Sequence, residues 1–184
     1  MPSLYHSTLE SRQKIGNISK LTFRTKFNGP IRTVEDEHLR KEDPVGADII
    51  DEALYFFKSN IFFSSYEIKS EADRNIIYLT LYIIECLKVI GNASSRNAAT
   101  QELFQLGLSK FAIPGDSAFP LNNLYSKPAS SKEADEMRSY LTQLRQECGL
   151  RVLEQAWPTG DKTPSKWWCC FAKRKFLNIS LAER

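Results

Sequence analysis

Few residues in this sequence are of the types that side-chain catalysis requires. The 184 residues include only two histidines, His6 and His38, and neither stands beside a recognisable nucleophile motif. A Ser/His or Cys/His catalytic device therefore has little to build on. The adjacent Cys169 and Cys170 lack the two-residue spacer and the second cysteine pair that indicate a zinc site. Because no Gly-x-x-x-x-Gly-Lys phosphate loop is present either, we expect no enzyme and no cofactor.

The residues best suited to binding lie near the C-terminus, where aromatic and basic side chains are mixed. Trp167, Trp168 and Phe171 stand among four basic residues. Such a segment could stack nucleic-acid bases, anchor at a membrane surface or fill pockets on a protein partner. Thr163 as the cap and Pro164 as the first helical residue predict that the segment is a helix.

The plainer interpretation is that the three aromatic rings pack into the core and the basic residues are solvated. The net charge of +3 is too small to indicate a polyanion partner by itself. A second basic stretch, between Ser11 and Val34, contains six Lys and Arg residues and no acid, although such runs are usually solvated surface. From charge and aromatic content we select six candidate partner-binding residues: Trp168, Lys173, Arg174, Lys175, Arg24 and Lys26.

The most apolar element begins after Ser70, which is suited to cap a helix, and reaches Gly91 or Asn92, either of which can close it in the left-handed conformation. Its isoleucines, leucines and tyrosines cover nearly the whole circumference, which predicts a helix buried by other elements. A membrane span is disfavoured because Arg74, Glu85 and Lys88 interrupt the apolar run.

Two amphipathic helices are expected on either side of it. One starts near Asp48, and the other opens with the capping-box pair Ser130 and Glu133 and continues to Trp157, with Gly149 as a possible break. The apolar residues 61–63 are expected to pack over the core. Residues 92–100 are small and polar and predict a loop, followed by a short helix at 101–106, and the charged residues 35–46 predict another loop.

Length and composition favour one soluble domain. The chain is long enough for a proper core, and no Pro/Gly/Ser-rich linker divides it. We expect a single domain, 1–184, with an extended, loop-rich segment at 1–46 and a helical body at 47–184. The extended segment is expected to lie across helices of its own domain or across a neighbouring subunit. No secretory signal opens the chain, so the cytosol is the expected compartment, where the four cysteines would stay reduced.

Several blocks of the sequence resemble subunit 3, the 21-kDa subunit, of the actin-related protein 2/3 complex. The similar blocks run in order along most of the chain, and the densest of them lie within residues 48–87. Departures are confined to loops, at 32–45, 92–101 and within the Pro-Gly loop near Pro114. The similar blocks include Asp48-Ile49-Ile50-Asp51-Glu52-Ala53, Tyr78-Leu79-Thr80-Leu81-Tyr82-Ile83, Ile113-Pro114-Gly115, Gln143-Leu144-Arg145-Gln146-Glu147 and Lys166-Trp167-Trp168.

This resemblance implies a compact all-α subunit with one central buried helix surrounded by other helices and with no enzymatic activity of its own. It implies a place in a seven-subunit assembly that nucleates actin filaments as branches on existing ones, chiefly on the actin-related protein 3 side. The partners would be the other subunits and, through the complex, actin filaments. ATP would bind the actin-related subunits, and the location would be cytoplasmic, in cortical actin structures.

Two other classes of function remain as alternatives. A basic and aromatic adaptor would bind RNA or an anionic membrane surface through the same tryptophans and lysines, with steep salt dependence. A thiol enzyme would require Cys169 or Cys170 as a nucleophile with a depressed pKa.

Overall fold

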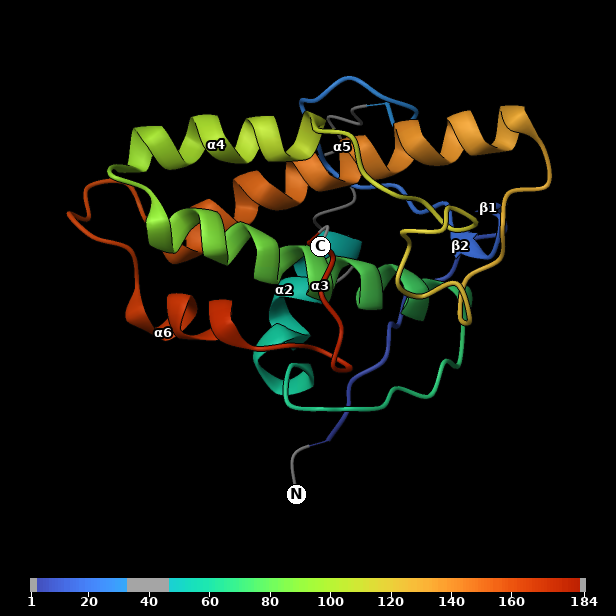
Figure 1. The fold of residues 1–184 in the computed structure, drawn as a ribbon, viewed down its shortest axis with the longest axis horizontal. Helices are drawn as coiled ribbons and strands as arrows, with labels where there is room; N and C mark the ends of the chain where they lie inside the picture. Colours follow the sequence, from blue (N-terminus) through green and yellow to red (C-terminus); the bar gives the residue numbers. More distant parts are fainter. Residues whose placement is uncertain (1–2, 33–46, 183–184) are drawn as a thin grey trace.

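The computed structural model describes residues 3–32 and 47–182, and this part of the chain is mostly helical (Figure 1). In Figure 1, α4 and α5 lie side by side, α3 crosses next to them, and α2 and α6 lie on the other side of α3. His38 and the loop expected at residues 35–46 lie outside the described residues. The elements are β1 (Lys14–Ile15), β2 (Ile18–Ser19), α2 (Ile49–Asn60), α3 (Glu71–Asn92), α4 (Arg96–Leu108), α5 (Ser131–Ala156), α6 (Lys166–Cys169) and the 3-10 helix η1 (Cys170–Lys173).

Both α2 and α3 begin where their caps predict. The Asp48 carboxylate accepts hydrogen bonds from the backbone N–H groups of Ile50 and Asp51, at 3.1 Å each, and the Asp51 side chain accepts from the Asp48 N–H. Ser70 Oγ accepts from the Asp73 N–H at 3.4 Å. Each cap satisfies donors that have no partner inside the helix.

The end of α3 differs from the expectation. Neither Gly91 nor Asn92 adopts the left-handed conformation; the helix runs through both and stops at Ala93, whose backbone is extended. A new cap, Ser95, follows at once and accepts from the Ala98 N–H at 3.0 Å. The loop expected at 92–100 is therefore wrong, because α4 already begins at Arg96.

The long helix α5 is continuous. Ser130 Oγ accepts from the Glu133 N–H at 3.1 Å, as the capping box predicts, and Gly149 does not interrupt the helix. The Glu133 carboxylate accepts from the N–H groups of Ala129 and Gly16. The start of α5 thereby also holds the turn between β1 and β2, where Gly16 has φ +58°.

The C-terminal helical segment is shorter than expected. α6 starts at Lys166, with Ser165 rather than Thr163 in the capping position and with no side-chain cap, and it continues as η1 to Lys173. Without a side-chain cap, its position depends on the packing of its aromatic residues against the body.

The N-terminal segment lies across helices of its own chain. β1 and β2 form a minimal antiparallel hairpin, with Lys14 paired with Ser19, which the sequence did not indicate. Asn75 of α3 accepts from the Ser19 N–H at 3.1 Å and donates to the Ser19 carbonyl at 2.8 Å. The Tyr140 hydroxyl of α5 makes the corresponding contacts with Leu21. Side chains of α3 and α5 thus satisfy backbone groups of the N-terminal segment that a neighbouring strand would otherwise pair with.

The helix α3 contributes many residues to the apolar core and packs against α2, α4, α5, α6, η1 and β2. By length and composition alone α3 could cross a membrane, but 72% of its most apolar window is buried inside the protein. This burial is that of a core helix. The same hydrophobic cluster includes Ile15 and Phe23 from the N-terminal segment and Phe176 near the other end of the chain.

Candidate interaction surfaces

The C-terminal aromatic residues divide between the core and the surface. The Trp168 ring stacks on Phe57 of α2 with centroids 5.9 Å apart, and the Phe171 ring meets Phe57 edge-on at 5.6 Å. Trp167, by contrast, is 81% exposed. The plainer interpretation, in which all three aromatic residues pack against the core, is thus correct for Trp168 and Phe171 and wrong for Trp167.

Around Trp167 lies a cleft of about 440 Å³ with aromatic walls and basic edges. The Lys58 ammonium lies 4.3 Å from the centre of the Trp168 ring, and the Arg174 guanidinium lies 4.9 Å from that of Phe62. Phe62 is 55% exposed, which corrects the expectation that it packs over the core. We call this area the C-terminal aromatic surface; its lining residues are Lys58, Phe62, Trp167, Cys170, Phe171 and Arg174.

Four of the six candidate residues belong to or adjoin this surface. Lys173, Arg174 and Lys175 are exposed, and Trp168 is half-buried. Trp167 was not among the six candidate residues. Two adjacent residues of a helix point about 100° apart, so one tryptophan of the pair had to face away from the core, but the pattern did not show which.

The other two candidates lie elsewhere. Arg24 forms ion pairs with Asp51 at 2.5 Å and Asp48 at 3.5 Å, next to the start of α2, while Lys26 is exposed. The C-terminal aromatic surface adjoins the other end of α2, about 15 Å away for ten residues of helix. The structure therefore does not join the two basic stretches into one patch.

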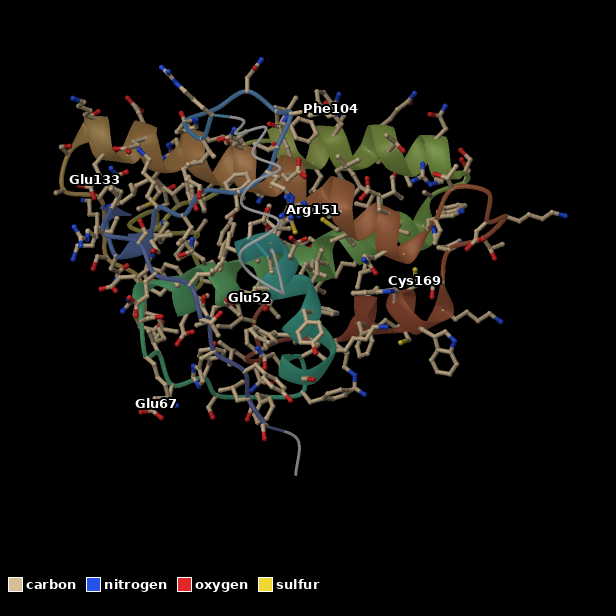
Figure 2. The ribbon with its side chains drawn as sticks, turned by 180° about the vertical axis from the view of Figure 1, so that it is seen from behind. Glu52, Glu67, Phe104, Glu133, Arg151 and Cys169 are labelled. Atoms are coloured by element: carbon tan, nitrogen blue, oxygen red, sulfur yellow. The ribbon has the colours of Figure 1, made fainter. Side chains whose placement is uncertain are left out.

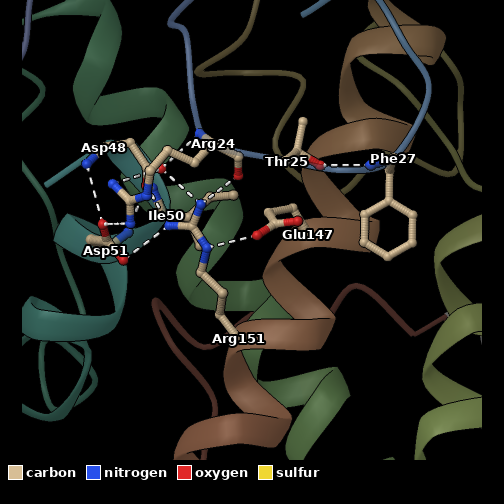
Figure 3. Close-up of polar contacts among 8 residues, drawn as sticks. All are labelled: Arg24, Thr25, Phe27, Asp48, Ile50, Asp51, Glu147 and Arg151. Carbon is tan, nitrogen blue, oxygen red and sulfur yellow. Dashed lines mark hydrogen bonds and ion pairs between the residues drawn. The ribbon is translucent and has the colours of Figure 1, made fainter. Parts of the chain in front are cut away.

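Arg24 lies at the exposed edge of an ionic cluster centred on the buried Arg151 of α5 (Figure 3). The Arg151 guanidinium donates to both Asp48 oxygens at 2.6 and 2.7 Å, to Asp51 at 2.9 Å and to Glu147 at 2.9 Å. It also donates to the Arg24 carbonyl at 2.6 Å. The cluster joins α2, α5 and the N-terminal segment, and Figure 2 shows Arg151 in the interior.

The charges in this cluster hold one another in the ionised form. Burial alone would raise the pKa of Asp48, but hydrogen bonds and charge from Arg151 and two backbone N–H donors bring this pKa below its usual value. Burial would lower the pKa of Arg151, and Asp48 and Asp51 raise it above its usual value. Because every charge has a partner, we assign the cluster a structural role.

The thiols offer little for catalysis. Burial raises the pKa of Cys86 to about 12 and raises that of Cys148 well above its usual range. Burial and the neighbouring Cys170 also raise the pKa of Cys169, the opposite of what a nucleophilic thiolate needs. Within residues 3–32 and 47–182, no group of three or more His, Cys, Asp or Glu side chains is placed to hold a metal ion.

A second exposed apolar area lies over α4 and α5. Phe104, Leu108 and Leu150 are between 37% and 49% exposed, and Phe104 projects from the outer edge of the molecule in Figure 2. Exposed aromatic and aliphatic groups of this kind mark contact areas more often than catalytic ones.

A mostly helical body that presents aromatic, basic and apolar surfaces is typical of proteins that work by contact with other chains. The comparisons with known proteins agree. Residues 1–181 match the family model described as "P21-Arc: ARP2/3 complex ARPC3 (21 kDa) subunit". The chain belongs to this family, whose members are subunits of the actin-related protein 2/3 complex.

Curated relatives cover nearly the full length. The actin-related protein 2/3 complex subunit 3 of Schizosaccharomyces pombe is 44% identical, over 98% of this chain and 100% of the relative. A probable subunit 3 from Caenorhabditis elegans is 43% identical, over 98% and 96%. Subunit 3 of Dictyostelium discoideum is 40% identical, over 97% and 99%. These relatives support the subunit interpretation and not the RNA- or membrane-binding adaptor.

Proposed function

We propose that this chain is a non-catalytic structural subunit of the actin-related protein 2/3 complex and contributes to nucleation of branched actin filaments. Its membership of the family carries the proposal, and the raised pKa of Cys169 argues against the thiol-enzyme alternative. The chain would bind no nucleic acid and no cofactor itself. Its location would be the cytoplasmic actin cytoskeleton, in cortical structures.

In the family fold we propose one domain, 1–184, in which α3 is the central helix. Support comes from the core, because hydrophobic residues from both ends of the described chain join α3 in one cluster. The buried α3 would give the subunit a rigid centre, so that surface contacts are held in fixed relative positions.

The C-terminal aromatic surface is the contact that we propose for a neighbouring subunit, chiefly on the actin-related protein 3 side. An exposed tryptophan in a cleft with basic edges has the composition of an interface hot spot. Lys173, Arg174 and Lys175 are exposed beside it and would complement an acidic face. Lys26, with Arg24 behind it, is a second and separate candidate contact.

The test replaces Lys173, Arg174 and Lys175 together by Glu in cells that carry only this copy of the subunit. We expect the tagged complex to lose this subunit in gentle purification and to form fewer branches per filament length. Trp167→Ala should have the same effect with little loss of stability, since its ring is mostly in solvent.

The matched control reverses three exposed lysines elsewhere, Lys14, Lys69 and Lys132, which changes the net charge by the same amount. This control should assemble and branch normally. Normal assembly and branching by the Lys173/Arg174/Lys175 variant would exclude the C-terminal surface as the contact.

A further inference from the structure

Arg145 is a second buried arginine of α5, and it lacks the carboxylate partners that surround Arg151. Arg145 is 5% exposed, about as buried as Arg151 at 8% and six residues before it in the same helix. Arg151 has three carboxylates around it, whereas Arg145 forms no ion pair with any residue of the described chain. The same helix therefore carries one neutralised and one unneutralised buried cation.

The contacts of Arg145 only partly replace a counter-ion. Its guanidinium lies between two aromatic rings, 4.5 Å from the centre of Tyr82 and 4.2 Å from that of Phe111. It donates to the Tyr78 hydroxyl at 3.3 Å and to the Leu106 carbonyl at 2.8 Å. Its Nε–H is buried and has no acceptor. Ring faces and neutral oxygens attract a cation, but a carboxylate binds a guanidinium more strongly and with two parallel hydrogen bonds.

Arg145 also lines a cavity of about 310 Å³ between α3, the end of α4 and the C-terminal residues. Lys110 stands in the same wall and adds a second cation and hydrogen-bond donor. The one acid in this wall, Glu85, is already engaged: its Oε1 lies 2.8 Å from the Lys88 ammonium and accepts from Ser180 Oγ at 3.1 Å. The cavity thus combines an unneutralised guanidinium with a second cation and aromatic walls.

We propose that this cavity receives a carboxylate side chain, Asp or Glu, from a neighbouring subunit of the complex, which neutralises Arg145. A buried charge without a counter-ion is costly, and an assembly subunit can obtain its counter-ion when the interface forms. The inference needs the chain to sit in its complex. It does not need the C-terminal aromatic surface to be the contact, because the two sites share no residues.

The test places an amine where the guanidinium stands, by the substitution Arg145→Lys, and treats the purified whole complex with a water-soluble carbodiimide. This reagent activates a carboxylate, which an adjacent amine then attacks to form an amide. We expect mass spectrometry to find an amide between position 145 and an Asp or Glu of another subunit. Arg151→Lys is the matched control and should give cross-links within the chain, to Asp48, Asp51 or Glu147.

Other outcomes would overturn the proposal. A cross-link from position 145 to Glu85, or to Glu183 beyond the described residues, would show that the counter-ion is intramolecular. No cross-link at position 145, with the Arg151→Lys product present, would show a cavity filled by water alone. If the Arg145→Lys complex fails to assemble, the unmodified complex decides, because Lys110 should then cross-link to another subunit's carboxylate. If Lys110 cross-links only within this chain, or not at all, the proposed site is excluded.

Discussion

At the scale of residues, the two buried arginines of α5 differ in their partners. Arg151 is neutralised within the chain and stabilises the fold, whereas Arg145 is available to a partner. The Arg151 cluster is internally complete: its carboxylates cap α2, contact α5 and accept from the N-terminal segment. Asp48 is central to it because its side chain both caps a helix and accepts hydrogen bonds from the two terminal nitrogens of Arg151. Such a residue should show a stability contribution that depends on its charge.

We therefore predict that Asp48→Asn destabilises the chain at neutral pH. Asparagine is as good a cap as aspartate, so the substitution removes the charge and keeps the cap. The cost should be about 2–3 kcal/mol, because Arg151 keeps Asp51 and Glu147. Asp48→Ala, which also removes the cap, should cost about 1 kcal/mol more. Urea unfolding of the purified chain at pH 7 measures both.

The pH dependence of this difference follows from the lowered pKa of Asp48. A carboxyl group whose pKa is lower in the folded state stabilises the fold above its unfolded pKa, about 3.9 for Asp, and loses that contribution as the pH falls through its folded value. The gap between wild type and Asp48→Asn should be constant from pH 7 to about 5 and shrink below about 4. A gap that stays constant down to pH 2 would contradict this account.

The residue scale also shows what the sequence could not resolve. The sequence indicated an aromatic and basic C-terminal segment. From it we selected Trp168 as a candidate, whereas the exposed tryptophan in the structure is Trp167. Which tryptophan faces outward is decided by how the segment packs, and Trp168 is the one that stacks on Phe57 of α2. This contact joins residues far apart in sequence, so the local pattern did not reveal it. The ion pairs of Arg24 were equally hidden, since they join residues far apart in sequence.

At the scale of elements, the helices that combine a cap with an apolar stripe were predictable, and α4, which has no clear stripe, was predicted only in part. α2, α3 and α5 start at Asp48, Ser70 and Ser130, as their capping residues indicate. The first residues of α4, 96–100, were assigned to a loop because they are small or polar, and only 101–106 was expected to be helical. Its inward residues, Ala99, Leu103 and Gly107, are too small and too few to give a clear period.

Close helix packing gives a prediction for the glycines. A methyl group added at Gly149 of α5 would meet Leu103 and Cys86 at 3.8–3.9 Å, which is ordinary contact. Since alanine is favoured over glycine inside a helix, Gly149→Ala should stabilise the chain by about 1 kcal/mol and raise its melting temperature by about 2–4 °C.

Two other glycines serve as controls for this substitution. Gly91→Ala, with no atom near the added methyl, should give a similar gain. Gly107→Ala should give less, because its methyl would lie 3.0 Å from Gln146 Cγ and press α4 against α5. Thermal unfolding of the three variants should rank Gly107→Ala last. A loss of stability in Gly149→Ala would show that α5 needs the smallest residue there.

At the scale of the whole molecule, the N-terminal segment and the helices form one hydrogen-bonded body. Asn75, Tyr140 and Gln143 are buried polar residues, and each bonds to the backbone of the segment. The sequence predicted extended chain here and could not show what satisfies its backbone. These three side chains lie in otherwise apolar helix faces. Only the folded structure shows that all three bind the backbone of the N-terminal segment.

This arrangement predicts slow hydrogen exchange in a segment that has almost no regular secondary structure. The N–H groups of Ser19, Leu21 and Ile31 donate to Asn75 Oδ1, Tyr140 Oη and Gln143 Oε1, at 3.1, 3.2 and 2.9 Å. Because these acceptors are buried, the amides can exchange only when the segment leaves the body. In the intact complex we expect exchange as slow as in the middle of α3, measured by mass spectrometry.

The substitution Asn75→Ala tests whether hydrogen bonds, and not burial alone, make the exchange slow. The alanine removes both hydrogen bonds to Ser19 and leaves that backbone's donor and acceptor unpaired, which should cost about 2–3 kcal/mol. Exchange at Ser19 and Leu21 should then accelerate by about 30- to 150-fold, while the N–H of Ile31, held by Gln143 of α5, should change less. Equal acceleration at all three would mean that the whole segment detaches as one unit. Fast exchange already in the wild type would make the segment a peripheral arm, and the helices alone would then carry the fold.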